Sequence, residues 1–151
     1  MVSTKYQVPI TKGIATGNHS QQAVVIELDL PPRCLSPNAR AHYFTRASAV
    51  KRYRTLAMWC TVEAMAKAGL STNGCHWQQV TVQCTFRFAQ RRRRDKDNLL
   101  ASMKAAFDGI ADSGLVVDDS AMTHLPVEIS IDPTRPSQVI VTIAPQEVAR
   151  G

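Results

Sequence analysis

The sequence predicts one α+β domain, with a mixed sheet of about four strands and two main helices packed on one face of the sheet. Two patterns predict it. Apolar residues alternate with polar ones in several short segments, and they recur every three or four residues in two longer segments. A chain of 151 residues with 44% hydrophobic and 20% charged residues has an ordinary globular composition. We expect a flexible arm over residues 1–21, the domain over residues 22–146 and a tail over residues 147–151.

The first predicted strand covers residues 26–30, where apolar side chains alternate with acidic ones. Pro31-Pro32 ends this strand, and Ser36-Pro37-Asn38 continues a rigid turn. A long helix is expected over residues 45–68, because one face carries small and apolar side chains at intervals of three and four. The residues of that face are Val50, Tyr53, Ala57, Cys60 and Ala64. Gly69 is placed to end the helix.

The clearest strand covers residues 80–88 and runs directly into four consecutive arginines. Its expected inward-facing residues are Val80, Val82, Cys84, Phe86 and Phe88. A second helix is expected over residues 98–112, closed by a glycine, and its apolar face carries Leu99, Met103, Phe107 and Ile110. Two further strands are expected over residues 125–131 and 139–143, with Asp132-Pro133 opening the turn between them.

Basic residues gather in two groups, within a chain that carries 18 Lys and Arg against 12 Asp and Glu and a formal charge of +6. The first group lies between Leu30 and Val62, a stretch that contains no acidic residue. Its members are Arg33, Arg40, Arg46, Lys51, Arg52 and Arg54. The second consists of Arg87, Arg91, Arg92, Arg93, Arg94, Lys96 and Lys104. A surface of this kind attracts a polyanion through phosphate contacts.

Half of the 12 acidic residues lie within or next to the second basic group: Asp95, Asp97, Asp108, Asp112, Asp118 and Asp119. In an extended segment, the spacing of Asp95 and Asp97 puts both carboxylates on one side. Asp119 can approach Asp95 only if the apolar Leu115-Val116-Val117 folds back along the second helix. Clustered carboxylates suit Mg²⁺ or Mn²⁺, and such ions support phosphodiester hydrolysis.

The same acids have simpler interpretations. Asp97 can cap the second helix, and Asp118-Asp119 can form a solvated turn. On one continuous helix Lys104 shares a face with Asp97 and Asp108, where it can hold a phosphate, steady the carboxylates or form only an exposed pair with Asp108. Spacing alone leaves these alternatives open.

The run from Arg91 to Leu99, followed by residues 104–108 and by Val117-Asp118-Asp119, closely resembles the RusA family of Holliday junction resolvases. These are small homodimeric endonucleases carried largely by prophages and phages. The segment Pro31-Pro32 with Ser36-Pro37-Asn38 looks like the proline–asparagine turn of that family. The resemblance covers residues 28–143 in element order, but its specific part is the block from Asp95 to Asp119.

This resemblance implies that Asp95, Asp97 and Asp119 bind Mg²⁺, for which Mn²⁺ substitutes, and that the metal activates water for attack on DNA. It gives Lys104 a catalytic role, although Lys104 lies three residues beyond the family's position, and Asn98 and Asp118 a supporting one. DNA contacts are expected from Arg91, Arg92, Arg93, Arg94, Arg40, Arg46, Lys51, Arg52 and Arg54. The expected protein is a cytoplasmic homodimer that resolves four-way junctions by paired nicks, without a small-molecule cofactor or a membrane segment.

Three other functions compete with this one: a DNA-binding module that does not cut, a nuclease for other branched or single-stranded DNA, and a small-molecule phosphohydrolase. The binding module differs from the nucleases in that its activity does not need Mg²⁺. The number of basic residues argues against the phosphohydrolase, because a small anion does not need so many. The four cysteines show no C-x-x-C pair and no zinc-ligand spacing, and we expect reduced, mostly buried thiols without a chemical role at Cys34, Cys60, Cys75 and Cys84. We expect Tyr43, Trp59 and Trp77 to pack in or near the core rather than stack on bases, and His124 to lie outside the site.

Overall fold

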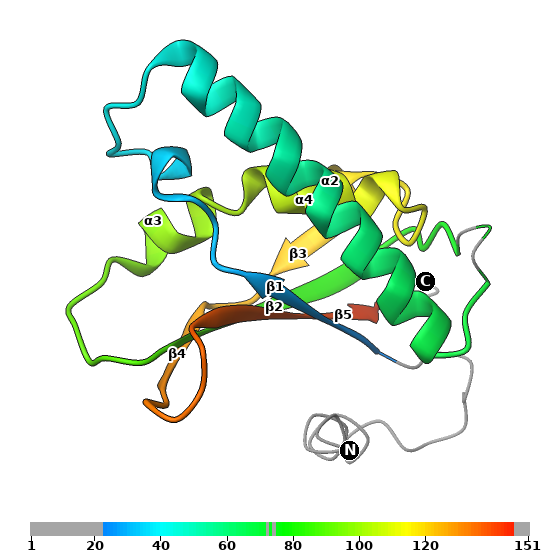
Figure 1. Cartoon of the computed structure of the whole chain (residues 1–151). Coiled ribbons are helices and arrows are strands. Elements are labelled where there is room, and N and C mark those ends of the chain that lie inside the picture. The colour runs from blue at the N-terminus through cyan, green and yellow to red at the C-terminus, as the bar shows by residue number, and fades with distance from the viewer. Residues whose placement is uncertain (1–22, 72, 74, 147–151) are drawn as a thin grey trace.

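The computed structural model describes residues 23–71, 73 and 75–146, so the predicted arm (1–21) and tail (147–151) lie outside the described residues. One mixed sheet carries the main helices on one of its faces, as Figure 1 shows. The predicted α+β class is confirmed, and the sheet has five strands rather than about four. None of the helices in the described ranges is long and apolar enough to cross a membrane.

The sheet is built around its longest strand. The strands are β1 (Val24–Asp29), β2 (Val80–Phe88), β3 (Met122–His124), β4 (Glu128–Ile131) and β5 (Gln138–Pro145). β5 lies between β1 and β2 and is antiparallel to both. β3 and β4 both run parallel to β2, β3 beside its first residues and β4 beside its last. The mixed sheet therefore combines an antiparallel half with a parallel edge.

The alternation predicted for three strands matches the buried face of the sheet. The side chains of β1, β2 and β5 that are essentially inaccessible include Val24, Ile26, Leu28, Val80, Val82, Cys84, Phe86, Val139, Val141 and Ile143. Burial raises the pKa of the Cys84 thiol to about 12. Cys84 is thus an inert core residue, as expected for a thiol without a chemical role.

The strand predicted over residues 125–131 is wrong in its bounds. The chain forms β3 before the predicted strand and β4 in its second half, and Pro126 lies between β3 and β4. Proline has no amide hydrogen, and the carbonyl of Pro126 accepts a hydrogen bond from Gln83 Nε2 at 2.7 Å instead of joining the ladder. Leu125 and Ile131, expected on the inner face of this strand, are 40% and 36% exposed, whereas Val127 is buried.

The long helix α2 (Tyr43–Lys67) forms as predicted, and Gly69 follows its end with φ +78°. Its predicted apolar face is rotated, however. The fully covered residues are Ala49, Tyr53, Ala57, Thr61 and Met65, whereas Val50, Cys60 and Ala64 lie at the margin. Thr61 is tolerated there because its hydroxyl donates to the Ala57 carbonyl at 2.7 Å.

The predicted second helix is two helices, α3 (Lys96–Ala101) and α4 (Lys104–Asp112). The Ser102 hydroxyl donates to the Leu99 carbonyl at 2.6 Å, and the Met103 amide donates to Leu100 at 3.0 Å, which tightens the turn. Lys104 therefore begins a new helix. The expectation that Lys104 shares a face with Asp97 on one continuous helix is wrong.

α2 packs closely against α4 (Figure 1). At Gly109 of α4 a side chain would meet the backbone of α2, because a β-carbon there would lie 2.1 Å from the carbonyl oxygen of Arg54. Beside this contact, the Arg54 guanidinium grips both carboxylate oxygens of Asp112 at 2.6 and 2.9 Å. These contacts fix the C-terminal half of α4 against α2, and Lys104 lies at the other end of the same short helix.

Candidate active site

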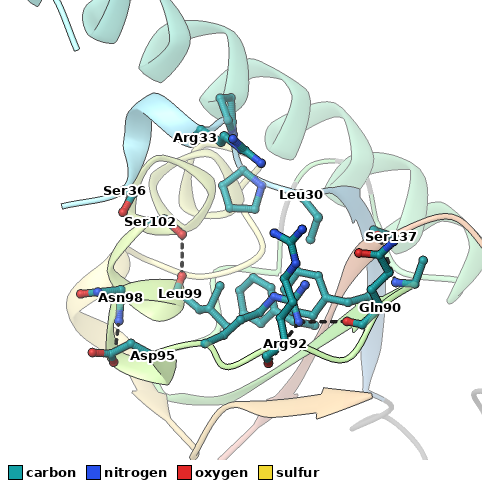
Figure 2. Close-up of a pocket in the computed structure, with 16 residues that line it drawn as sticks. Leu30, Arg33, Ser36, Gln90, Arg92, Asp95, Asn98, Leu99, Ser102 and Ser137 are labelled. Atoms are coloured by element: carbon teal, nitrogen blue, oxygen red, sulfur yellow. Dashed lines mark hydrogen bonds between the residues drawn. The ribbon is translucent and has the colours of Figure 1, made fainter. Parts of the chain in front are cut away.

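A pocket of about 550 Å³ opens where the loop after β2 meets α3 and the proline segment after β1. Its floor is apolar and includes Phe86, Phe88 and Leu99. Figure 2 shows Asp95 and Asn98 on one side of the hollow, Gln90 and Ser137 on the opposite side, and Arg33 above it. The pocket therefore joins the predicted proline turn to the first part of the Asp95-to-Asp119 block.

Asp95 begins α3 as its cap. Its Oδ1 accepts hydrogen bonds from the backbone amides of Asp97 at 2.9 Å and Asn98 at 3.3 Å. The expectation that Asp97 could cap this helix is therefore wrong by two residues, and Asp97 lies exposed in the first turn. Asp95 lines the pocket, with Asn98 one helical turn after it.

Three arginines line the same pocket: Arg33, Arg92 and Arg94. The Arg94 guanidinium lies 3.5 Å from the centre of the Phe88 ring and donates to the Gln90 carbonyl at 3.1 Å. Burial, and then the positive charge of Arg92, lower the pKa of Arg94. Within the described ranges, none of the three forms an ion pair with an acid. Arg91 and Arg93 are exposed and lie outside the pocket lining.

The second half of the acidic block forms a separate cluster at the start of α4. Lys104 Nζ contacts Asp108 at 2.9 Å and also Asp119. These hydrogen bonds, that of Asp119 first, raise the pKa of Lys104, and the Lys104 ammonium lowers the pKa of Asp119. Asp118 accepts a hydrogen bond from the Ser120 amide at 2.7 Å and caps a short 3₁₀ helix, η3 (Asp119–Ala121). The expected exposed Lys104–Asp108 pair is present, together with a second acid.

The chain after Gly114 folds back along α4, which is the condition the sequence set for an approach of Asp119 to Asp95. Leu115 and Val116 are buried, but Val117 is 41% exposed. Val116 pairs with Trp77 in an isolated bridge, and Asp119 returns to Lys104 of α4. Over the described residues, no group of three His, Cys, Asp or Glu side chains is placed to hold a metal ion. Of the three predicted ligands, Asp95 lines the pocket, Asp97 is exposed in the first turn of α3 and outside the pocket lining, and Asp119 lies in the Lys104 cluster.

The basic residues near and on α2 differ in what they are free to contact. Arg54 is engaged by Asp112, Arg46 donates to the Cys34 carbonyl at 2.7 Å, and Arg52 donates to Ser48 at 3.0 Å. Arg40 and Lys51 are exposed. Arg46 and Arg54 therefore have structural contacts of their own, and DNA contacts by the whole set stay a prediction.

Sequence reasoning missed part of the site. Arg33 was grouped with the basic residues but received no role, although it follows Pro31-Pro32 directly and that turn leads into the pocket.

Two aromatic side chains of α2 are more exposed than expected. Tyr43 and Trp59, expected to pack in or near the core, are 74% and 62% exposed. His124 lies against Phe107 with ring centres 4.5 Å apart, and burial lowers its pKa against the opposing effect of Asp119. A surface aromatic on a long helix carries no periodic signal that separates it from a core aromatic.

Comparison with known proteins adds one relative. No family model matches the chain. A protein of Xylella fastidiosa (strain Temecula1 / ATCC 700964), described as uncharacterized, is 35% identical over 125 residues, which cover 82% of this chain and 77% of that protein. A crystal structure of cyanuric acid hydrolase from A. caulinodans covers 85% of this chain at 18% identity and a TM-score of 0.36. The chain spans 41% of that hydrolase, and a likeness this weak carries no argument.

Proposed function

The chain belongs to the same family as the Xylella fastidiosa protein, and we propose that it is a metal-dependent endodeoxyribonuclease that cuts branched DNA, with the four-way junction as its substrate. One observation carries the proposal. Lys104 contacts Asp119, so the aspartate pair at the end of the RusA-like block returns to the helix that follows Asp95 and Asp97. This contact supports the proposal because it brings Asp119 to the first residue of α4, the helix that follows α3.

The proposed ligands are Asp95, Asp97 and Asp119, whose carboxylate oxygens are the donors that Mg²⁺ and Mn²⁺ prefer. Asp95 uses Oδ1 for its cap hydrogen bonds, and Oδ2 accepts none from the described residues. A metal held there would supply an activated water and neutralise charge on the reacting phosphate. Lys104 balances the charge of Asp108 and Asp119 in the free protein, and Asn98 and Asp118 support the ligands from neighbouring backbone positions.

DNA binding rests on charge. Arg92 and Arg94 in the pocket, Arg91 and Arg93 beside it, and the exposed Lys51 of α2 would contact phosphates. A homodimer would place two such sites on the near two-fold symmetric arms of a junction and nick two strands. The proposed location is the cytoplasm, because the DNA substrate is there.

A second candidate is a module that binds branched DNA without cutting it. The observation that favours it is that Asp95 and Asp118 are both engaged as helix caps, which explains their presence without a metal. Under this alternative, Asp97→Asn strengthens DNA binding slightly, because it removes a negative charge from a basic surface.

Cleavage of a labelled four-way junction decides between these functions. The protein is incubated with the junction, with duplex and with single-stranded DNA, in Mg²⁺, in Mn²⁺ and in EDTA. We expect paired symmetric nicks on the junction alone, abolished by EDTA and by Asp97→Asn. Asp29→Asn is the matched control, because it removes the same charge from an exposed position on β1 and should leave cleavage unchanged. Binding of the junction without cutting in either metal would overturn the nuclease and favour the binding module.

A further inference from the structure

We propose that the pocket beside Asp95 binds one unpaired nucleotide of the DNA, with its base on the apolar floor and its phosphate against Arg33 and Arg92. The inference rests on the proposed function and narrows its substrate. The preferred DNA is one in which a base next to the cut lies outside the helical stack.

The size and floor of the pocket suit a base. Its volume of about 550 Å³ falls within the range of roughly 300 to 1,000 Å³ that is typical of sites for small ligands, and a duplex is far too large for it. Leu30 and Leu99 are partly exposed and present apolar surface, while Phe86 and Phe88 are buried behind the pocket. A phosphate gains nothing by contacting apolar surface. A base reaches such a floor only when it leaves the stack, and this costs least where it has no partner.

The charges around the pocket suit a phosphate. Arg33, Arg92 and Arg94 line it, and no acid pairs with them in the described ranges. The guanidinium carbon of Arg94 lies 3.5 Å from the centre of the Phe88 ring, and the guanidinium group is a surface on which a base can stack. Arg33 and Arg92 come from separate segments, the turn after β1 and the loop after β2, and remain available for the phosphate.

Polar side chains offer contacts for the edge of the base. Asn98 and Gln90 carry amides, and they lie on opposite sides of the hollow in Figure 2. Asp95 lines the same pocket, so the phosphate of a bound nucleotide would lie next to the proposed metal ligands. The pocket thus connects recognition of an unpaired base with the position of the cut.

Binding of bulged DNA tests the inference without any cleavage. Two hairpin duplexes, each with a single bulged position, are compared by fluorescence anisotropy in EDTA: one bulge carries 2-aminopurine, the other an abasic residue. We expect the base-containing bulge to bind about tenfold more tightly, as one stacked base does in single-strand binding proteins. The 2-aminopurine emission should change when the base enters the pocket.

Two arginines of the same run provide the matched variants. Arg92 lines the pocket and Arg93 does not. Both side chains are exposed, and replacing either by alanine removes one positive charge. The phosphate reaches Arg92 only when its base enters the pocket, so the abasic probe does not use this contact. We therefore expect Arg92→Ala to abolish most of the tenfold preference, and Arg93→Ala to weaken both probes alike and keep the preference. Ser36→Trp, which fills the pocket mouth, should remove the preference while the abasic probe still binds.

Equal affinity of the native protein for the two probes would overturn the inference, as would equal effects of Arg92→Ala and Arg93→Ala on the preference. The arginine pair decides the matter even if Ser36→Trp does not fold. The binding measurements contain no metal and are therefore independent of cleavage. A base preference without junction cleavage would support nucleotide binding in the pocket and refute the nuclease activity. Cleavage without a base preference would support the nuclease activity and refute nucleotide binding in the pocket.

Discussion

Replacing Gly109 by alanine tests the close approach of α2 and α4. The new β-carbon would lie 2.1 Å from the carbonyl oxygen of Arg54 and 3.0 Å from the β-carbon of Ala57. The nearer obstacle is backbone, so the helices must separate. Overpacking of this kind costs about 1–3 kcal/mol, and we place it at the upper end because no rotamer change relieves it. Alanine returns about 1 kcal/mol through its better helix propensity. The net loss in the free energy of unfolding is about 2 kcal/mol.

Thermal unfolding followed by circular dichroism measures this loss. For a chain of this size, about 2 kcal/mol corresponds to a decrease in Tm of about 4–8 °C. Junction cleavage should decline as well, because the shift of α4 displaces Lys104. Adding Ala57→Gly removes the second contact but leaves the carbonyl in place, so the double variant should regain little. A Tm for Gly109→Ala equal to or above that of the native protein would refute this account of the helix contact.

Two further predictions concern the two roles of Asp95, as helix cap and proposed metal ligand, and the ion pair between Arg54 and Asp112. Asp95→Asn keeps a good N-cap and should leave Tm nearly unchanged while abolishing metal-dependent cleavage, whereas Asp95→Ala should lose about 1 kcal/mol of stability as well; equal Tm values for the two variants would contradict the capping role. Arg54 lowers the pKa of Asp112 below its ordinary value of 3.8, so the pair stabilises the fold above that pH and ceases to do so as Asp112 is protonated below it. Arg54→Met should therefore cost up to about 1 kcal/mol at pH 7, a modest amount because both side chains are partly exposed. In urea titrations at several pH values, the difference from the native protein should disappear below pH 3.8, and a constant difference down to pH 2 would exclude the ion pair as its cause.

Sequence periodicity predicted the inner faces of β2 and β5 well. The expected residues from Val80 to Phe88 and from Val139 to Ile143 are buried, although Arg87 and Ile140 between them are buried as well. The same method joined α3 to α4, because the apolar spacing continues across Ser102 and Met103. The break comes from a hydroxyl that competes for a backbone carbonyl, and hydrophobic spacing contains no information about that competition.

The sequence singled out the candidate site residues, whose role stays a prediction, but it did not predict how the fold groups them. Asp95, Lys104 and Asp119 were identified from the order of the acids and the lysine, and the return of Asp119 to α4 followed from the apolar stretch after Gly114. The pocket itself could not be foreseen. Its lining comes from the turn at Arg33, the loop at Arg92 and the start of α3, and only the tertiary fold brings these together.

The position of β5 has a consequence for the synthesis of the protein on the ribosome. β5 is the last strand of the described chain, yet it lies between β1 and β2, and its Ile143 pairs with Val24 in the first strand. β1 emerges more than a hundred residues earlier and pairs with no other described strand, so its hydrogen-bonding edge stays open to chaperones or to other nascent chains for several seconds at ordinary translation rates. A chain cut short before Gln138 would lack the strand that joins both halves of the sheet, and we expect it to be degraded rather than to persist as a partly folded domain.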